Sequence, residues 1–314
     1  MRDTINKQKF EIDYPESNFT TNLRSKLEFI NSNLTKYYFL YNFTSQTDKY
    51  SNPWYYNYNE LFDIHHNDCE YPDPNNTLLR EPNRVLKRFF PQIRVVFSNG
   101  SFESGGRLYA AVPDGIGNWQ SMPQQQRRTI LINNRPTVEL DFDSFHITML
   151  YATQGLQLDF DPYDTVAPKE MRPIIKKLLL TVLNADSEKS AVQSMQQQIR
   201  ELAGKREVSQ RELKFIQAVD NNRPDWQELI DALKEAHGPI RNYFCSGAGL
   251  ALQRLDSEIM RSALHSLAEQ HIPALPIHDS AIVAAHHERD LQEAMDLAYK
   301  SLFGADLHCG ISKK

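Results

Sequence analysis

Residues 273–287 read PALPIHDSAIVAAHH, an apolar run that carries a polar pair into a second apolar run. Pro273 to Ile277 has the composition of a short buried strand, and Ala281 to Ala284 is typical of its return strand. We therefore expect a hairpin that presents His278 and Asp279 at its tip.

An earlier stretch, TVELDFDSFHITMLYA at residues 137–152, places another carboxylate at a strand end. Thr137 to Phe142 alternates like a strand, Asp141 lies near its end, and an apolar helical segment follows. Two strand-end carboxylates supported by apolar packing form a cradle for divalent metal. A divalent metal site of this kind is the least that an enzyme needs to transfer a nucleotidyl group.

The composition is typical of a globular protein. The 314 residues are 40% hydrophobic and 24% charged, enough to bury the core of one large domain or two ordinary ones. We expect no membrane span and no signal peptide, because no apolar run is long enough for either. The three cysteines are far apart and odd in number, which favours a reducing, cytoplasmic compartment.

The net charge of −5 hides an uneven distribution. Residues 80–135 contain nine basic and three acidic residues, whereas residues 139–164 contain six carboxylates and neither lysine nor arginine. A basic stretch beside an acidic one suits a phosphate track that leads to a metal site. The alternative is a solvated surface with chance clustering of charge.

Periodicity along the chain predicts mainly helices. They are expected at 25–30, 59–64, 80–90, 145–153, 173–183, 250–270 and 291–303. A strand is expected at 94–97, before the Asn99-Gly100 turn, and residues 71–76 resemble a turn-rich linker. Residues 187–235 are polar and helical in character, including an exposed hairpin of helices.

Other short motifs are weaker. His65-His66 with Cys69 suggests zinc, but no second pair at metal-ligand spacing accompanies it, so an ordinary cluster is favoured. Gly105-Gly106 lacks the Gly-Lys-Ser/Thr ending of a phosphate loop. No Ser-His-Asp spacing stands out, and no cysteine has an evident base.

Four stretches, two of which include the segments quoted above, follow one another along the chain: GGRLY (105–109), ELDFDSFHITMLYA (139–152), RPIIKKLLLTVLNA (172–185) and DSEIM…PIHDSAIV (256–283). They resemble the polymerase motifs of the family A palm, as found in single-subunit phage and mitochondrial RNA polymerases and, more distantly, in family A DNA polymerases. The resemblance covers roughly residues 94–303 and leaves residues 1–93 unexplained.

The resemblance implies roles for individual residues. In a Gly-Arg-x-Tyr element, Arg107 and Tyr109 would contact the template–product hybrid. Asp141 would be the metal-binding aspartate of motif A. His278 and Asp279 match the His-Asp pair of motif C.

The chemistry of these residues agrees with those roles. Phosphoryl transfer to a 3′-hydroxyl needs two metal ions about 4 Å apart, here Mg²⁺ or Mn²⁺. Asp141 and Asp279 are the expected bridging ligands, and the carbonyl of Phe142 could complete a site because magnesium takes few protein ligands. Arg172 and Lys176 match the Arg-x-x-x-Lys of motif B, share a helix face, and are expected to hold the triphosphate. The alternative account makes the aspartates turn residues and the two cations a solvated helix face.

Three positions depart from the family pattern. Motif B usually ends in Tyr-Gly, whose ring closes on the nascent base pair, whereas this chain has Asn184-Ala185. Five residues after Asp141, where RNA polymerases carry a small residue and DNA polymerases a glutamate, stands His146, so the sugar preference is open. Asp143 is a third metal ligand or, as we favour, a surface residue.

These features predict an α+β fold: a polymerase palm with a small antiparallel sheet, helical fingers and a short helical N-terminal region. We expect a mostly helical or irregular region at 1–93 and a polymerase core at 94–314, with a helical insertion at 186–236. The expected function is template-directed polymerisation by a compact enzyme of phage or mobile-element type. Whether it makes DNA or RNA, and whether it is primase-like, stays open.

The expected partners are a nucleic-acid template and primer and nucleoside triphosphates, with an accessory protein left open. Two other functions are considered. A template-independent nucleotidyltransferase is disfavoured by the basic stretch at 80–135 and by Arg107. A nucleic-acid-binding protein with a degenerate palm is favoured by Asn184 but disfavoured by Asp141, Asp279 and Lys176.

Overall fold

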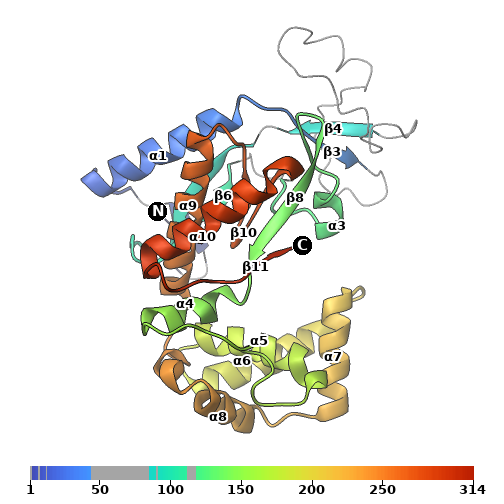
Figure 1. The fold of residues 1–314 in the computed structure, drawn as a ribbon. Helices are drawn as coiled ribbons and strands as arrows, with labels where there is room; N and C mark the ends of the chain where they lie inside the picture. Colours follow the sequence, from blue (N-terminus) through green and yellow to red (C-terminus); the bar gives the residue numbers. More distant parts are fainter. Residues whose placement is uncertain (1, 6–7, 12, 44–84, 90, 112–117) are drawn as a thin grey trace. The chain divides into compact units, whose positions relative to one another are not determined.

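The computed structural model describes residues 2–5, 8–11, 13–43, 85–89, 91–111 and 118–314 (Figure 1). The chain divides into two compact units. The sheet unit comprises residues 1–143 and 254–314, and the helical unit comprises residues 144–253. The two units combine antiparallel strands with many helices, which confirms the α+β class.

The sheet unit is built on a seven-stranded sheet with the strand order β4-β3-β7-β8-β10-β9, to which β11 is added beside β8. All of its strand pairs are antiparallel. The strands are β3 (Phe39–Phe43), β4 (Val85–Phe89), β7 (Leu131–Ile132), β8 (Arg135–Phe142), β9 (Leu275–Ile277), β10 (Ser280–Ala284) and β11 (Ile311–Lys313). Two asparagines with positive φ, Asn133 and Asn134, close the two-residue turn between β7 and β8, as tight hairpins favour.

Strand β8 lies between two partners at its C-terminal end. Asp141 pairs with Ser280 of β10 on one edge and with Ser312 of β11 on the other. Because directly paired residues point to the same face and successive residues alternate, Asp141 and Glu139 share one face. Phe142 points to the opposite face, where its ring lies 6.3 Å from that of Tyr299.

Helix α10 (Glu288–Phe303) packs against this opposite face of the sheet and contacts both β8 and β10. Its buried residues include Leu291 and Met295. Apolar packing on the α10 side therefore holds β8 and β10 in register and leaves the carboxylate-bearing face free for polar chemistry.

Two hairpins and a long helix complete this unit. Strands β5 (Ile93–Phe97) and β6 (Gly105–Ala110) form one hairpin, and β1 (Arg2–Ile5) and β2 (Gln8–Glu11) form another. Helix α1 (Asn18–Leu34) begins at a Ser17 capping box. Its Asn31 side chain bonds the backbone N–H and carbonyl of Ile93, at 2.8 and 2.9 Å, which attaches α1 to β5.

The helical unit packs around α5 (Arg172–Asn184). Its other helices are α4 (Phe145–Thr153), α6 (Glu188–Ala203), α7 (Gln210–Asn222) and α8 (Trp226–Ala236). Buried Leu178 and Val182 of α5 contribute to its core, with Met195 of α6 and Leu233 of α8. Side chains of Ser187, Ser209 and Asp225 cap α6, α7 and α8 and satisfy their free N–H groups. Helix α9 (Gly249–Glu269) begins in this unit and continues into the sheet unit.

Most of the predicted elements are confirmed with small changes of their ends. The strands expected at 94–97, 137–142, 273–277 and 281–284 are β5, β8, β9 and β10. The helices expected at 145–153, 173–183, 250–270 and 291–303 are α4, α5, α9 and α10, and that expected at 25–30 belongs to the longer α1.

One prediction is wrong. The basic helix expected at 80–90 is replaced by strand β4 at Val85–Phe89, which pairs along its whole length with β3. Local periodicity gave way to ladder hydrogen bonds with a strand whose paired residues lie 42 to 50 positions earlier in the chain, a long-range pairing that no local pattern encodes. Since β3 also pairs with β7, two described segments before residue 93, β3 and β4, contribute strands to the main sheet.

Other predictions lie outside the described residues: the helix at 59–64, the linker at 71–76 and the His65-His66-Cys69 cluster. Within the described part of the chain, no helix combines the length and apolar character that crossing a membrane requires.

Candidate functional site

Asp141 carries negative charge that its surroundings balance only in part. One carboxylate oxygen, Oδ2, lies 2.6 Å from the ammonium of Lys314. The other, Oδ1, is buried and has no hydrogen-bond partner among the described residues. Burial, followed by repulsion from Asp279, raises the pKa of Asp141 from 3.8 to about 6, although Lys314 acts in the opposite direction. An oxygen in this state is a ready acceptor for a cation.

Asp279 lies beside Asp141 at the tip of the β9–β10 hairpin. It directly precedes Ser280, the cross-strand partner of Asp141, and its backbone carbonyl accepts a 3.2 Å hydrogen bond from the N–H of Phe142. The preceding residue, His278, has a φ of 54°. A left-handed non-glycine residue costs about 1–3 kcal/mol, and such strain is concentrated at functional sites.

A buried ion pair underlies these two carboxylates. Glu139, two residues before Asp141 and on the same face, receives two hydrogen bonds from Arg127, at 2.8 and 2.9 Å. The buried hydroxyl of Ser280 donates to the same glutamate at 3.1 Å. This network ties β10 to β8 directly beneath the acidic pair.

A second ion pair lies at the β6 side of the hairpin. Arg107 of β6 donates to Asp256 of α9 at 2.9 Å, and Asp256 is fully buried. The ring of Tyr109 meets that of His278 edge-on, with centroids 5.9 Å apart. Burial and the positive charge of Arg107 lower the pKa of His278, so its imidazole is neutral at neutral pH. The structure thus gathers Arg107, Tyr109 and His278 on neighbouring elements.

The acidic pair fits a hydrated divalent cation. Two repelling carboxylates and a buried oxygen without a partner provide the oxygen ligands and negative charge that Mg²⁺ prefers, and Mg²⁺ retains several of its waters. The described residues contain no cluster of three or more His, Cys, Asp or Glu side chains that could hold a metal on its own. A metal here would therefore be held by few protein ligands and completed by water or substrate oxygens.

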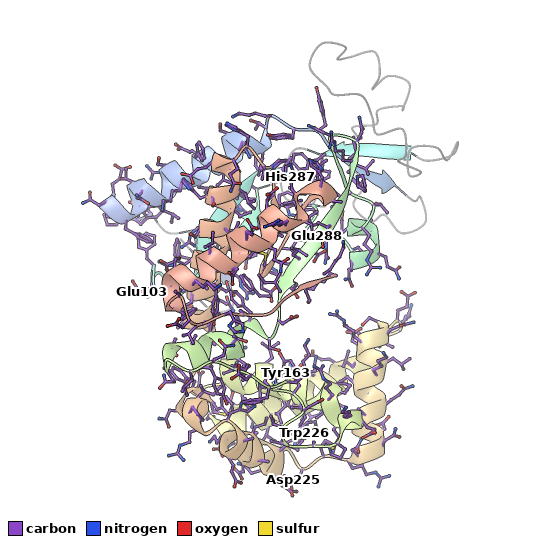
Figure 2. All side chains as sticks on the ribbon, in the orientation of Figure 1. Glu103, Tyr163, Asp225, Trp226, His287 and Glu288 are labelled. Atoms are coloured by element: carbon purple, nitrogen blue, oxygen red, sulfur yellow. The ribbon has the colours of Figure 1, made fainter. Side chains whose placement is uncertain are left out.

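The two predicted phosphate-binding cations belong to the helical unit. Arg172 and Lys176 both approach the ring of Tyr163, at 5.1 and 5.3 Å from its centroid, which places them on one face of α5 (Figure 2 labels Tyr163). Arg172 also forms ion pairs with Asp161 and Asp164. These contacts orient the two cations, but acidic side chains already neutralise part of their charge.

The remaining predicted residues are spread over both units. His146 is a half-buried residue in the first turn of α4, and Asn184 is the exposed last residue of α5, donating to the carbonyl of Leu180 at 2.7 Å. Asp143 is exposed and accepts a 2.7 Å hydrogen bond from Ser312, outside strand β8. The described structure thus forms one group around the acidic pair and another along α5, each within its own unit.

Four charged residues of the first group were not predicted as site residues: Arg127, Glu139, Asp256 and Lys314. Asp256 had a signal, because it is an acidic residue that shares a helical face with the buried Leu252, Ile259 and Ala263 of α9. Glu139 stood at a strand position that points the same way as Asp141. Lys314 had no local signal, since only sheet pairing brings it to Asp141.

Comparison with known proteins identifies no family for this chain. No known protein family matches the sequence, and no curated protein matches it. A solved structure that resembles it is the POL domain of Pol1 from M. smegmatis, in complex with DNA primer-template and dNTP. The two share 12% identity with a TM-score of 0.45, over 72% of this chain and 47% of that one, so this chain spans about half the length of its neighbour. A likeness of this degree defines neither the fold nor the activity.

Proposed function

We propose that the protein is a metal-dependent, template-directed nucleotidyltransferase, a compact polymerase with a palm of the family A type. The observation that carries the proposal is the acidic pair: Asp141 of β8 and Asp279 of the neighbouring β9–β10 turn repel each other, and one buried carboxylate oxygen of Asp141 has no hydrogen-bond partner among the described residues. The ordered sequence motifs that resemble the family A palm support the same assignment.

In this proposal Asp141 and Asp279 hold Mg²⁺ or Mn²⁺, with the carbonyl of Phe142 as a further ligand. A bound divalent ion would lower the pKa of the primer 3′-hydroxyl and stabilise the leaving pyrophosphate. Ser280 links β10 to Glu139 of β8, and Arg127 balances the charge of Glu139, so that the acidic side chains stay in place when substrate binds.

The other residues bind the substrates. Lys176 and Arg172 contact the triphosphate and stabilise the charge that grows on it during transfer, with Lys176 acting in the chemical step. Asn184 and His146 contact the incoming nucleotide in this proposal. Tyr109 and neutral His278 offer ring surfaces to the template–product hybrid, and Arg107, whose side chain is paired with Asp256 but stays 21% exposed, contacts the backbone of that hybrid.

One observation favours a second candidate, a template-independent nucleotidyltransferase. Two arginines of the basic stretch at 80–135, Arg107 and Arg127, are engaged with internal carboxylates. This leaves fewer charges to follow a template backbone than the sequence suggests.

The test is incorporation of labelled nucleotides by the purified chain with Mg²⁺, Mn²⁺ or EDTA. Each dNTP and rNTP mixture is supplied with a primed template, with an unprimed template, and with a single strand that offers no template. We expect incorporation that requires metal and copies the template sequence. Extension that ignores template sequence would favour the second candidate, and template binding without incorporation under any condition would favour a degenerate palm.

A further inference from the structure

Strand β11 brings a lysine to the acidic pair from the opposite edge of β8. Ser312 pairs with Asp141, and the backbone N–H of Lys314 donates to the carbonyl of Glu139 at 3.0 Å. Because side chains alternate along a strand, Ser312 and Lys314 point to the face that carries Asp141. Lys313, between them, points to the other face.

The contacts of the two lysines agree with this alternation. The ammonium of Lys314 lies 2.6 Å from Oδ2 of Asp141, and their side chains are 28% and 16% exposed. The ammonium of Lys313 lies 2.6 Å from Glu288, the first residue of α10, on the opposite side of the sheet (Figure 2 labels Glu288). Lys313, the last residue of β11, and Lys314, which follows it, thus form ion pairs on opposite faces of the sheet.

The position of Lys314 conflicts with metal binding. Its ammonium binds a carboxylate oxygen that a divalent cation at Asp141 would need. If both bound the same carboxylate, the ammonium and the cation would repel each other strongly, because the site is half-buried. The backbone of Lys314 is held by the sheet, but its side chain is long and partly exposed, so its ammonium has a route into solvent.

We propose that Lys314 is a built-in counter-ion of the acidic pair, and that a divalent cation binds Asp141 only after displacing it. The Lys314 side chain thereby acts as a latch: its ammonium occupies the carboxylate of Asp141 until a divalent ion, arriving with its substrate, displaces it. This inference rests on the proposed function, because it takes the acidic pair to be a metal site.

The test measures binding of Mn²⁺ alone to the full chain, by the loss of the electron paramagnetic resonance signal of free Mn²⁺. Lys314→Met should tighten Mn²⁺ binding by about tenfold, the effect expected for losing a competing, partly buried ion pair. Lys313→Met removes the same charge from the same strand but on the other face, so its affinity should stay within about twofold of the unsubstituted protein. Asp141→Asn should abolish the site.

The outcomes separate the latch from the metal site. The latch is wrong if the Mn²⁺ affinity of Lys314→Met equals that of the unsubstituted protein, or if Lys313→Met gains as much affinity as Lys314→Met. The metal site stands in either case, provided that Asp141→Asn loses binding. If neither the unsubstituted protein nor Lys314→Met shows saturable binding, both the latch and the proposed metal site are wrong.

Two further variants guard against a folding defect. Lys314→Gln should tighten binding as Lys314→Met does, whereas Lys314→Arg keeps the charge and should bind Mn²⁺ like the unsubstituted protein. Thermal unfolding in EDTA and in Mn²⁺ gives an independent readout, since the latch predicts a larger Mn²⁺-induced rise in Tm for the two neutral variants. Equal rises in all four proteins would overturn it.

Discussion

Asp141 is a residue at which function and stability oppose each other. Its carboxylate is mostly buried, lies beside a second carboxylate, and is balanced by Lys314 at only one oxygen. A protein selected for stability alone would replace this group with a neutral one. The proposed metal site accounts for this charge, because a bound cation would balance both carboxylates.

The raised pKa of Asp141 makes stability depend on pH in the metal-free protein. The folded state holds the proton more tightly than the unfolded state, so this carboxyl's contribution is fully favourable below pH 4 and is lost as the pH rises through about 6. In EDTA, Asp141→Asn should raise the free energy of unfolding by up to about 3 kcal/mol at pH 8 and change it little at pH 4.

Urea unfolding at the two pH values measures this difference. Asp143→Asn is the matched control, because Asp143 is an exposed carboxylate two residues away, and it should show no such gain. A stability difference for Asp141→Asn that is independent of pH would contradict the raised pKa.

The second residue-scale prediction concerns His146. Five residues after Asp141, an imidazole near C2′ of an incoming nucleotide would crowd a 2′-hydroxyl, so His146→Gly should raise ribonucleotide use relative to deoxyribonucleotide use. The kcat/KM ratio for ATP and dATP measures this. A falling ribonucleotide share would instead indicate a hydrogen bond to the hydroxyl, and an unchanged ratio would remove His146 from the site.

At the scale of elements, sequence patterns predicted what local physics determines. Helices α5 and α9 follow from apolar periodicity, α4 follows from a continuous apolar run, and the β9–β10 hairpin follows from apolar runs around a polar pair. Strand β4 was predicted as a helix, and β3 and β11 were not predicted, because distant backbone partners make them strands. Such pairings depend on the whole sheet, and no window of sequence contains them.

Helix α5 provides an element-scale prediction with an internal control. Arg172→Ala and Lys176→Ala should each lower kcat/KM for nucleotides by about 10- to 100-fold, because both cations share the face that is proposed to bind the triphosphate. Lys177→Ala should have little effect, since Lys177 lies over the ring of Phe215 on α7, 5.2 Å from its centroid. Steady-state kinetics of the three variants test this, and equal losses in all three would contradict a specific face.

At the scale of the whole molecule, the candidate site was predicted only in part. The sequence identified the carboxylates at the ends of β8 and β9, because strand ends and turns leave a local signature. It did not reveal that Arg107 and Arg127 of the basic stretch are bound to the buried carboxylates of Asp256 and Glu139. Charge counts along a chain do not distinguish a surface cation from one consumed by an internal ion pair.

The distinction predicts different effects for two adjacent arginines. Arg128 is exposed, so Arg128→Gln should weaken binding to a primed template and reduce its salt dependence by about one unit of log-log slope, without changing Tm. Arg127→Gln should lower stability by about 3 kcal/mol, because it leaves the buried carboxylate of Glu139 without its cationic partner. Fluorescence anisotropy at several salt concentrations, with thermal unfolding, tests both. Binding that is insensitive to salt would contradict a phosphate track.

The central claim is that Asp141 and Asp279 form the catalytic metal site of a nucleotidyltransferase. The most direct test compares primer-extension rates of Asp141→Asn, Asp279→Asn and the control Asp143→Asn, at equal folded concentration and saturating Mg²⁺. We expect losses of about 10³-fold or more for the first two variants and a rate near that of the unsubstituted protein for the third. Retained activity in either Asp141→Asn or Asp279→Asn would contradict it.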